Sequence, residues 1–393
     1  MSESIVITGA ARTPMGGFQG ELSAVTAPQL GAVAIEAALS RAGIEPGDVD
    51  EVMMGCVLPA GLGQAPARQA AMGAGLPNSV PATTVNKMCG SGMKTVMVAY
   101  DQLLAGNGKI VVAGGMESMS NAPYMLTKAR DGMRMGHGQV MDHMFLDGLE
   151  DAYEPGRAMG TFAEDCASKF SFSREDQDEY ALKSLSNALQ AQEEGTFKDE
   201  IAAVEVKGRK ETVTIAEDEQ PKNARPDKIP LLKPAFKKDG SITAANASSI
   251  SDGAAALVLT TESEAQSRKL PVRAQILGHA SHAQEPGWFT AAPVPAIQKL
   301  LEKIGWSIDD VELWEVNEAF AVVPMAAMAE LGIPRDKLNI RGGACALGHP
   351  IGTSGTRIIV TLLHAMESLG LKRGVAAICI GGGEGTAIAI ERN

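Results

Sequence analysis

A cysteine in a glycine-rich turn is the residue of this chain best placed to do covalent chemistry. Cys89 lies in the run Asn86–Gly92, directly before a segment, 93–104, whose apolar residues recur at helical spacing. Ser91 is a suitable cap for this helix, and a thiol at a helix N-terminus lies at the positive end of the helix dipole. That position favours the thiolate, the form that attacks carbonyl carbons. The alternative for this stretch alone is a small buried hydrophobic side chain.

A second loop of similar composition lies in the second half of the chain. The run Gly342–Pro350 contains His349, and it holds the place in its half that the Cys89 loop holds in the first. The two halves align because the helix-ending glycines Gly43 and Gly305 are each followed by an Asp-Val turn and then a strand. A pseudo-two-fold axis would bring the two loops together. Cysteine and histidine side by side form the simplest activated nucleophile.

Two further polar side chains follow predicted strands of the second half. Cys379 ends an apolar strand directly before Gly381-Gly382-Gly383, and Asn317 follows the strand 312–316. Both would therefore lie at the carboxyl edge of a sheet, where open α/β folds bind ligands. A thiol there could move a proton at carbon, and an amide could hold a water or an oxyanion. The alternatives are a buried strand cysteine and a helix-capping asparagine.

The pattern of elements predicts a duplicated α/β fold. Apolar strands alternate with helices in both halves, which indicates parallel sheets covered on both faces. We expect an N-terminal domain, 1–270, and a C-terminal domain, 271–393. Within the first, the alternation breaks down from about 120 to 246, which predicts an inserted loop domain with a functional role.

Composition restricts the class of partner. The formal net charge of −12 argues against nucleic acid or an anionic membrane as the main partner. No apolar run approaches the ~18 residues of a membrane span, and the strand Ile5–Ile7 begins too early to leave room for a signal peptide. The five cysteines are widely scattered, which suits a reducing compartment. We therefore expect a cytoplasmic protein without a disulfide framework.

Taken together, these motifs resemble the thiolase family, the acetyl-CoA C-acyltransferases, over the whole length of the chain. The matching blocks are Asn86–Gly92, Gly114–Ser120, Asn317–Ala321, Gly342–Gly355 and Cys379–Gly383. Five blocks in the family's order and at similar spacing make the resemblance specific. It implies duplicated thiolase-type βαβαβ halves in a layered α/β/α/β/α core, with the loop domain inserted in the first half.

The resemblance also implies a reaction and a role for each site residue. Two acyl-CoA molecules would condense reversibly to a 3-ketoacyl-CoA and coenzyme A, in a ping-pong sequence. Cys89 would carry the acyl group and be activated by His349, and Cys379 would take or return the α-proton. Asn317, through a water, and His349 would stabilise the enolate oxygen, while the backbone N–H groups of Cys89 and Gly381 would form a second oxyanion hole. Coenzyme A and acyl-CoA are then substrates, and the family implies no permanently bound cofactor and no metal.

By motif position, the resemblance places coenzyme A largely against the inserted segment. Ser248 would contact the pantetheine arm, and Lys222 stands where many members carry an arginine near the nucleotide. Lysine cannot reproduce the planar, bidentate contacts of arginine. The residues expected to line the tunnel are Leu149, Met159, Ala244, Ala319 and Phe320. The family forms dimers and tetramers, so we expect a homo-oligomer, a homotetramer from the length of the insertion, and a role such as fatty-acid β-oxidation.

One departure from the family pattern concerns the acyl chain. Ala158 precedes Met159-Gly160, where acetoacetyl-specific members carry a histidine. Losing this imidazole removes a polar wall near the acyl site. We therefore expect the protein to accept longer or bulkier acyl chains than acetoacetyl.

Other classes of protein fit the residues less well. A dinucleotide-dependent dehydrogenase would need a helix after its glycines, whereas Gly381–Gly385 leads into the predicted strand 386–390. A metal enzyme could be imagined from the pairs His279 and His282 or His137 and His143, but neither pair has further ligands at suitable spacing.

Two alternative classes share the expected fold, and the identities of the site residues distinguish them from a thiolase. A non-catalytic acyl-binding relative predicts the loss of Cys89, His349 or Cys379, and all three are present. Condensing enzymes that use acyl carrier protein typically replace Cys379 by histidine or asparagine. Cys345 is expected to pack; the alternative is oxidative inactivation through a disulfide with a catalytic cysteine.

Overall fold

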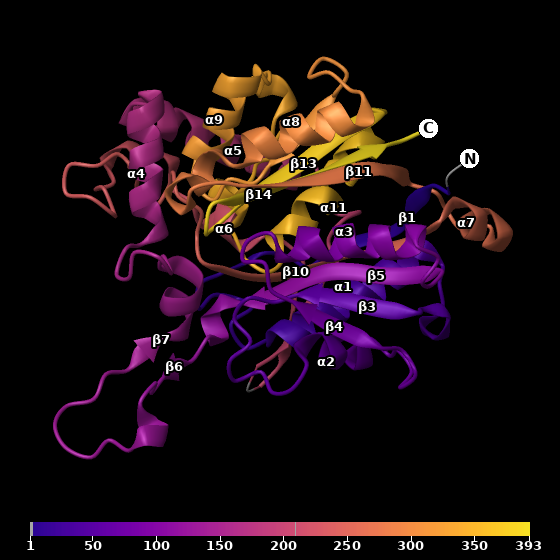
Figure 1. The fold of residues 1–393 in the computed structure, drawn as a ribbon, viewed down its shortest axis with the longest axis horizontal. Helices are drawn as coiled ribbons and strands as arrows, with labels where there is room; N and C mark the ends of the chain where they lie inside the picture. Colours follow the sequence, from indigo (N-terminus) through magenta and orange to yellow (C-terminus); the bar gives the residue numbers. More distant parts are fainter. Residues whose placement is uncertain (1–2, 209) are drawn as a thin grey trace.

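The computed structural model describes residues 3–208 and 210–393. Within these residues, a ten-stranded sheet contains two halves with the same strand order (Figure 1). One half runs β3 (Glu51–Gly55), β5 (Ile110–Ser118), β10 (Ser251–Thr261), β1 (Ile5–Arg12), and the other runs β12 (Leu313–Val316), β13 (Arg373–Ile380), β14 (Glu384–Glu391), β11 (Ala274–Ala283). The antiparallel pair β1–β11 joins them, and β4 (Ala82–Val85) extends the first half. The predicted duplication is confirmed.

The sheet is mixed, so the prediction of parallel sheets was wrong for part of each half. The pairs β3–β5, β3–β4 and β12–β13 are parallel, whereas β10 and β14 run antiparallel to their neighbours. In the second half, the antiparallel direction of β14 follows from the short connection that precedes it. β14 follows β13 after the short turn Gly381–Gly383, and a connection this short can only make a hairpin.

Helices and half-sheets stack in five layers. α3 (Ser91–Leu104) and α11 (Ser354–Leu369) lie between the half-sheets; α1 (Ala27–Ala42) and α2 (Pro66–Gly73) cover the first half, and α8 (Pro293–Ile304) and α9 (Val322–Leu331) cover the second. Strand residues alternate between layers: Val111 and Ala113 of β5 pack toward α3 and α11, whereas Ile110 and Val112 pack toward α1. The predicted α/β/α/β/α core is confirmed.

The helices end where the sequence predicts. Gly43, Gly305 and Gly370 follow α1, α8 and α11 with φ of 67°, 73° and 67°, a left-handed conformation that glycine adopts without strain. α1 begins with a capping box in which Thr26 and Gln29 satisfy each other's backbone.

The two central helices touch through glycines at their first turns. A methyl group added at Gly355 would lie 2.4 Å from the backbone nitrogen of Met93, and one at Gly92 would lie 2.7 Å from Oγ1 of Thr356. This backbone contact fixes the N-termini of α3 and α11 against each other. The loops that precede the two helices are therefore held at the same place.

Residues 119–250 leave the sheet between β5 and β10. They form an arm with the small pair β6 (Tyr124–Met125) and β7 (Met141–Asp142), which projects from the body in Figure 1. The helices α4 (Met159–Phe170) and α5 (Arg174–Glu193) follow, the latter near 174–194 as predicted. The other elements are η1 (Pro46–Asp48), η2 (Met119–Asn121), η3 (Ala129–Asp131), η4 (Phe145–Leu149), β8 (Val204–Lys207), β9 (Thr212–Ile215), α6 (Glu219–Asn223), η5 (Pro226–Leu231), α7 (Glu262–Arg268), η6 (Pro286–Ala291), η7 (Arg335–Lys337), α10 (Ala344–Leu347) and β2 (Gly16–Gly17).

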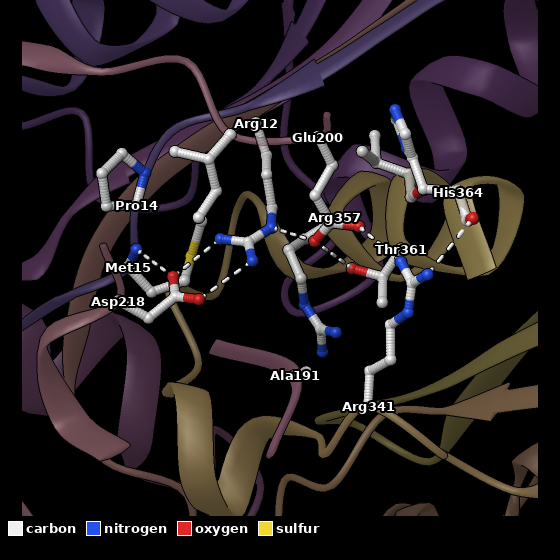
Figure 2. A network of polar contacts seen from close by, with 12 residues as sticks. Arg12, Pro14, Met15, Ala191, Glu200, Asp218, Arg341, Arg357, Thr361 and His364 are labelled. Atoms are coloured by element: carbon white, nitrogen blue, oxygen red, sulfur yellow. Dashed lines mark hydrogen bonds and ion pairs between the residues drawn. The ribbon is translucent and has the colours of Figure 1, made fainter. Parts of the chain in front are cut away.

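Buried ion pairs tie this segment to the sheet. Arg12 of β1 is fully buried and contacts the carboxylates of Glu200 at 2.5 Å and Asp218 at 2.7 and 2.9 Å (Figure 2). Removing one partner of such a pair would leave an uncompensated buried charge. The inserted segment is therefore anchored to the core, and the domain boundary at 270 stays a prediction. Among the described residues, none of the helices combines the length and apolar character of a membrane span.

Candidate active site

Cys89 sits in a tight turn immediately before α3. Met88 adopts φ of +46°, which is uncommon for a residue with a side chain. Oγ of Ser91 accepts a hydrogen bond from the N–H of Lys87 at 2.8 Å and donates to the carbonyl of Met88 at 2.6 Å. Ser91 was expected to cap the helix, but Gly90 occupies the N-cap and Ser91 is the first helical residue. The serine therefore holds the turn that presents Cys89.

Burial dominates the electrostatics of the Cys89 thiol. It raises the pKa of Cys89 to about 11, although the N–H groups of Gly381 and of Cys89 itself point at the sulfur and lower it. The nearby Glu117 carboxylate raises the pKa further. The expectation of a thiolate in the free protein was therefore wrong, because desolvation outweighs the helix dipole. A base must take the proton when this thiol reacts.

His349 is buried with one ring nitrogen engaged and the other without a partner. Nδ1 lies 2.6 Å from Oγ of Ser354, whose hydroxyl lies 3.1 Å from the carbonyl of Pro350. A hydroxyl that donates to this carbonyl accepts from Nδ1–H, which leaves Nε2 as the basic nitrogen. Within the described parts of the chain, Nε2 has no hydrogen-bond partner. Burial, assisted by the charge of Arg357, lowers the pKa of His349 to about 3, so the ring is neutral.

Glu117 links the His349 loop to the first half of the fold. Its carboxylate accepts hydrogen bonds from the N–H of Val57 at 2.9 Å, Leu58 at 3.1 Å and Gly352 at 2.9 Å. Gly352 lies three residues beyond His349 and its carbonyl oxygen is 3.0 Å from the Cβ position of Gly92. The loop after His349 therefore rests on the first turn of the helix that follows Cys89.

Cys379 lies near the carboxyl end of β13, and Asn317 directly follows β12, the parallel strand beside it; the sequence predicted a carboxyl edge for both residues. The N–H of Asn317 donates to the carbonyl of Ala377 at 2.9 Å, two residues before Cys379. Burial raises the pKa of Cys379 well above its usual range, and the neighbouring Cys89 raises it further. Both amide atoms of Asn317 are buried without a partner in residues 3–208 and 210–393. A buried amide in this state is suited to bind a water or an oxyanion.

Four of the residues expected near the acyl and pantetheine groups surround this centre. Ser248 contacts the carbonyl of Ala319 through its N–H at 3.0 Å and its hydroxyl at 2.9 Å, and Phe320 pairs with the strand-like residue before Ser248. Sδ of Met159 lies 3.4 Å from the Cβ position of Gly381.

Leu149 joins a small apolar cluster with its neighbours on both loops. This cluster includes Met88, Cys89 and Ile351, so Leu149 lies beside the thiol loop and the residue that follows His349-Pro350.

A cavity of about 250 Å³ lies next to Ser249, and Ala244 lines it. Arg225 and Lys228 line it as well, whereas Lys222 does not. The ammonium of Lys222 instead lies 3.0 Å from the carboxylate of Glu21. The sequence shows only a dense run of charges here, so the roles of Arg225 and Lys228 were not predicted.

Cys345 also lines this cavity. Its Sγ faces the backbone carbonyls of Asn246 at 3.7 Å and Glu318 at 3.8 Å, and burial raises its pKa well above the usual range. All five cysteines are free thiols in the part of the chain that is described. The packing role of Cys345 agrees with this geometry, and its oxidation stays a prediction. No group of three or more His, Cys, Asp and Glu residues is arranged to hold a metal ion within that part.

Comparison with known proteins identifies the family. The chain matches the model of the thiolase N-terminal domain over residues 5–263 and that of the thiolase C-terminal domain over 270–392. It is 49% identical over 391 residues to a probable acetyl-CoA acetyltransferase of Dictyostelium discoideum, covering 99% of this chain and 94% of that one. It is 47% identical to an acetyl-CoA acetyltransferase of Pseudomonas aeruginosa, covering all of both chains.

Solved structures agree with this assignment. The Acat5 thiolase of Ascaris suum in complex with coenzyme A superposes with a TM-score of 0.94 at 42% identity, covering 99% of this chain and 100% of that chain. The acetyl-CoA acetyltransferase of Bacillus anthracis gives a TM-score of 0.96 at 42% identity, with 99% of each chain covered. The fold, built around two loops that present a thiol and an imidazole, is that of an acyltransferase. The chain belongs to the thiolase family.

Proposed function

We propose that this protein is a thiolase that transfers acyl groups between coenzyme A thioesters through an acyl-Cys89 intermediate. Sγ of Cys89 attacks the thioester carbonyl while its proton passes to Nε2 of His349, and the coenzyme A thiolate leaves with that proton. The N–H groups of Cys89 and Gly381 hold the oxygen that becomes negative. The observation that supports the proposal is the Cys89 thiol beside the Gly381 N–H and the Cys379 thiol, together with His349 and Asn317, whose Nε2 and amide atoms are buried without a partner in the described residues.

The second half-reaction uses the other thiol. Cys379 gives its proton to the neutral Nε2 of His349, and its thiolate removes the α-proton of a bound acetyl-CoA. The resulting carbanion attacks the acyl carbon on Cys89. Asn317, through a water, and His349 stabilise the enolate oxygen. The new carbon–carbon bond releases Cys89 as its thiolate, which takes back the proton held by His349. The reverse sequence cleaves a 3-ketoacyl-CoA with coenzyme A. Because a thioester is exchanged for another thioester, a sulfur nucleophile suits both directions.

Two measurements on cysteine variants test this assignment. Incubation with acetyl-CoA should add one acetyl group per chain, located on Cys89 by peptide mass spectrometry, and Cys89→Ser should abolish this thioester. Cys379→Ala should still be acetylated on Cys89, but it should form 3-ketoacyl-CoA at least about a hundredfold more slowly, since proton transfer at carbon loses its base. Cys166→Ala, which changes a buried thiol in α4, serves as the matched control.

The outcome that contradicts the proposal is acetylation elsewhere in the chain with Cys89 unmodified. Equal loss of the acyl-enzyme in Cys379→Ala and Cys166→Ala would likewise contradict the proposal that Cys89 carries the acyl group while Cys379 only transfers a proton.

We propose further that the acyl group need not be acetyl. Ala158 caps α4 with only a methyl group, directly before Met159, which contacts the Gly381 position. Kinetics with a series of 3-ketoacyl-CoA substrates should show comparable kcat/KM for four-carbon and longer chains, and Ala158→His should favour acetoacetyl-CoA. A steep preference of the unaltered protein for acetoacetyl-CoA would contradict this proposal; the relatives named above carry acetyl-CoA in their names.

Assembly into a homo-oligomer is part of the same proposal. The arm around β6 and β7 presents exposed apolar side chains, among them Tyr124 and Met135, which a monomer would leave in water. Light scattering of the purified protein distinguishes monomer, dimer and the proposed tetramer. A cytoplasmic location and a role in β-oxidation stay predictions.

A further inference from the structure

A basic cleft of about 830 Å³ opens at the end of α11 opposite to His349. We define it by Arg41, Lys198, Arg273, Arg341, His364 and Glu367, which come from the end of α1, the segment after α5, the entry to β11, the loop before α10 and the last turns of α11. His364 lies ten residues beyond Ser354 on this helix, or about 15 Å along its axis. The cleft is therefore separate from the thiol site.

The cleft carries an excess of positive charge. Glu367 is bound by Arg273 through two hydrogen bonds, of 2.9 and 2.5 Å, so these two charges compensate each other. Lys198 forms no ion pair with any described residue. Asp199 also borders the cleft, and its exposed carboxylate offsets part of the positive charge of Arg41 and Arg341. For a chain with a formal net charge of −12, this local surplus is unusual.

Arg41 is fixed in the cleft without a carboxylate partner among residues 3–208 and 210–393. Its guanidinium donates to the carbonyls of Ala10 at 2.9 Å, Glu200 at 2.9 Å and Ile201 at 2.8 Å. These bonds hold the side chain in place. Burial and the charge of Arg273 lower the pKa of Arg41 and outweigh the Glu200 and Asp199 carboxylates, which raise it. The positive charges of this cleft therefore repel one another in the protein alone.

Arg341 and His364 are similarly positioned at the inner wall (Figure 2). The guanidinium of Arg341 donates to Oγ of Ser368 at 2.5 Å, and the nearest carboxylate oxygen, on Glu200, is 3.8 Å away. Arg12 and Thr361 bind the other oxygen of that carboxylate, Oε1, so the Oε2 that faces Arg341 has no hydrogen-bond partner in the described residues. Nδ1 of His364 lies 2.8 Å from the carbonyl of Val360, which leaves Nε2 without a partner in the described chain.

We propose that this cleft binds a small organic phosphate, independently of the thiol site. Phosphate oxygens accept several charged donors at once, and arginine and lysine groups from four segments converge here. The volume lies in the range of small-molecule sites and exceeds what a single phosphate group fills. A bound phosphate would compensate the charges of Arg41 and Lys198. This site goes beyond the proposed acyl transfer and does not depend on it.

Titration calorimetry with inorganic pyrophosphate tests the proposal in the full-length protein at constant ionic strength. We expect one site per chain whose affinity is unchanged by saturating pantetheine, which carries the thiol arm of coenzyme A without its phosphates. Lys198→Glu should weaken binding at least tenfold, because it reverses a charge at an exposed position that folding does not need. Lys207→Glu, at an exposed lysine of β8 outside the cleft, makes the same change of charge and should leave binding unaltered.

Further ligands define the chemistry of the site. ADP should compete with pyrophosphate, whereas citrate, which carries a similar charge on carboxylates, should bind at least tenfold more weakly. Absence of binding at millimolar pyrophosphate, displacement by pantetheine, or equal weakening in the two lysine variants would each overturn the proposal. Equal affinity for citrate would overturn the assignment of a phosphate.

Discussion

Nδ1 of His349 lies 2.6 Å from Oγ of Ser354, the first residue of α11. Because the serine hydroxyl lies 3.1 Å from the Pro350 carbonyl, this contact orients the ring and determines which nitrogen is free to act as a base. The same helix start is pressed against α3 through Gly355. The imidazole is thus positioned by the backbone contact that also positions the thiol.

Replacing Ser354 by alanine should lower the rate of Cys89 acylation while the protein stays folded. The loss of one orienting hydrogen bond corresponds to about 1.4 kcal/mol, or roughly a tenfold slower single-turnover acetylation. Ser267→Ala, which removes an exposed hydroxyl bonded to a carbonyl in α7, is the control. An unchanged acetylation rate in Ser354→Ala would show that the ring is held by other contacts.

Replacing Arg357 by methionine should shift the acidic limb of the pH–rate profile to higher pH. The positive charge of Arg357 disfavours the imidazolium form, and together with burial it lowers the pKa of His349 to about 3. Removing the charge therefore raises this pKa, by about one unit. Acylation requires the neutral ring, so the rate should begin to fall at a higher pH as the solution is acidified.

Two carboxyl groups also lie near Arg357 or the His349 loop, so the control variant for Arg357→Met must keep the positive charge. Arg357 lies 3.7 Å from Glu315, whose pKa burial raises to about 8, so this carboxyl is largely neutral below that pH and loss of the arginine does not leave a buried carboxylate. Glu117 faces the same loop through Gly352. Arg357→Lys keeps the positive charge and should keep the profile. Coincident profiles for the methionine and lysine variants would contradict the electrostatic explanation.

Replacing Glu117 by glutamine should destabilise the fold by roughly 2 kcal/mol, measured by urea unfolding at pH 8. Both carboxylate oxygens accept backbone N–H groups, from Val57 and Gly352 on one and from Leu58 on the other. An amide has only one acceptor atom, so its NH2 group would oppose at least one N–H in either orientation. Glu211→Gln, at an exposed position, should change stability by less than about 0.5 kcal/mol.

The stability of the same variant should also depend differently on pH. Burial raises the pKa of Glu117 from 4.5 to about 7, so between these values the folded protein holds a proton that the unfolded chain has released. The contribution of Glu117 to the free energy of unfolding therefore falls as pH rises through that window. Glu117→Gln should lack this contribution; an identical pH dependence in both proteins would show that the carboxyl is already ionised below pH 7.

Replacing Gly355 by alanine should force the central helices apart. The added methyl would lie 2.4 Å from the backbone nitrogen of Met93, which cannot move without shifting α3. We expect a loss of about 2 kcal/mol or more in unfolding free energy and slower acylation of Cys89. At Gly47 an added methyl meets no atom within 4 Å, so Gly47→Ala is the matched control. Equal stability of the two variants would show that the helix contact adapts.

Much of the architecture follows from local patterns in the chain. The repeated helix-ending glycines and Asp-Val turns predicted the duplication, since equal local sequences build equal elements, and the strand order confirms it. The same alignment of the two halves predicted that the Cys89 loop and the His349 loop hold equivalent places. The antiparallel direction of β14 was missed, although the short turn Gly381–Gly383 contains the information.

What the tertiary structure decided is the electrostatic state of each group. The sequence placed Cys89 at a helix N-terminus and therefore predicted a thiolate, but the depth of burial, which spacing does not encode, raises its pKa to about 11. Glu117, Arg357 and Ser354 were not predicted as partners of the site, because each acts through contacts between segments far apart in the chain. Local sequence thus determined which groups the chain presents, whereas packing between the halves determined their protonation and their neighbours, since both depend on distances and solvent exclusion in three dimensions.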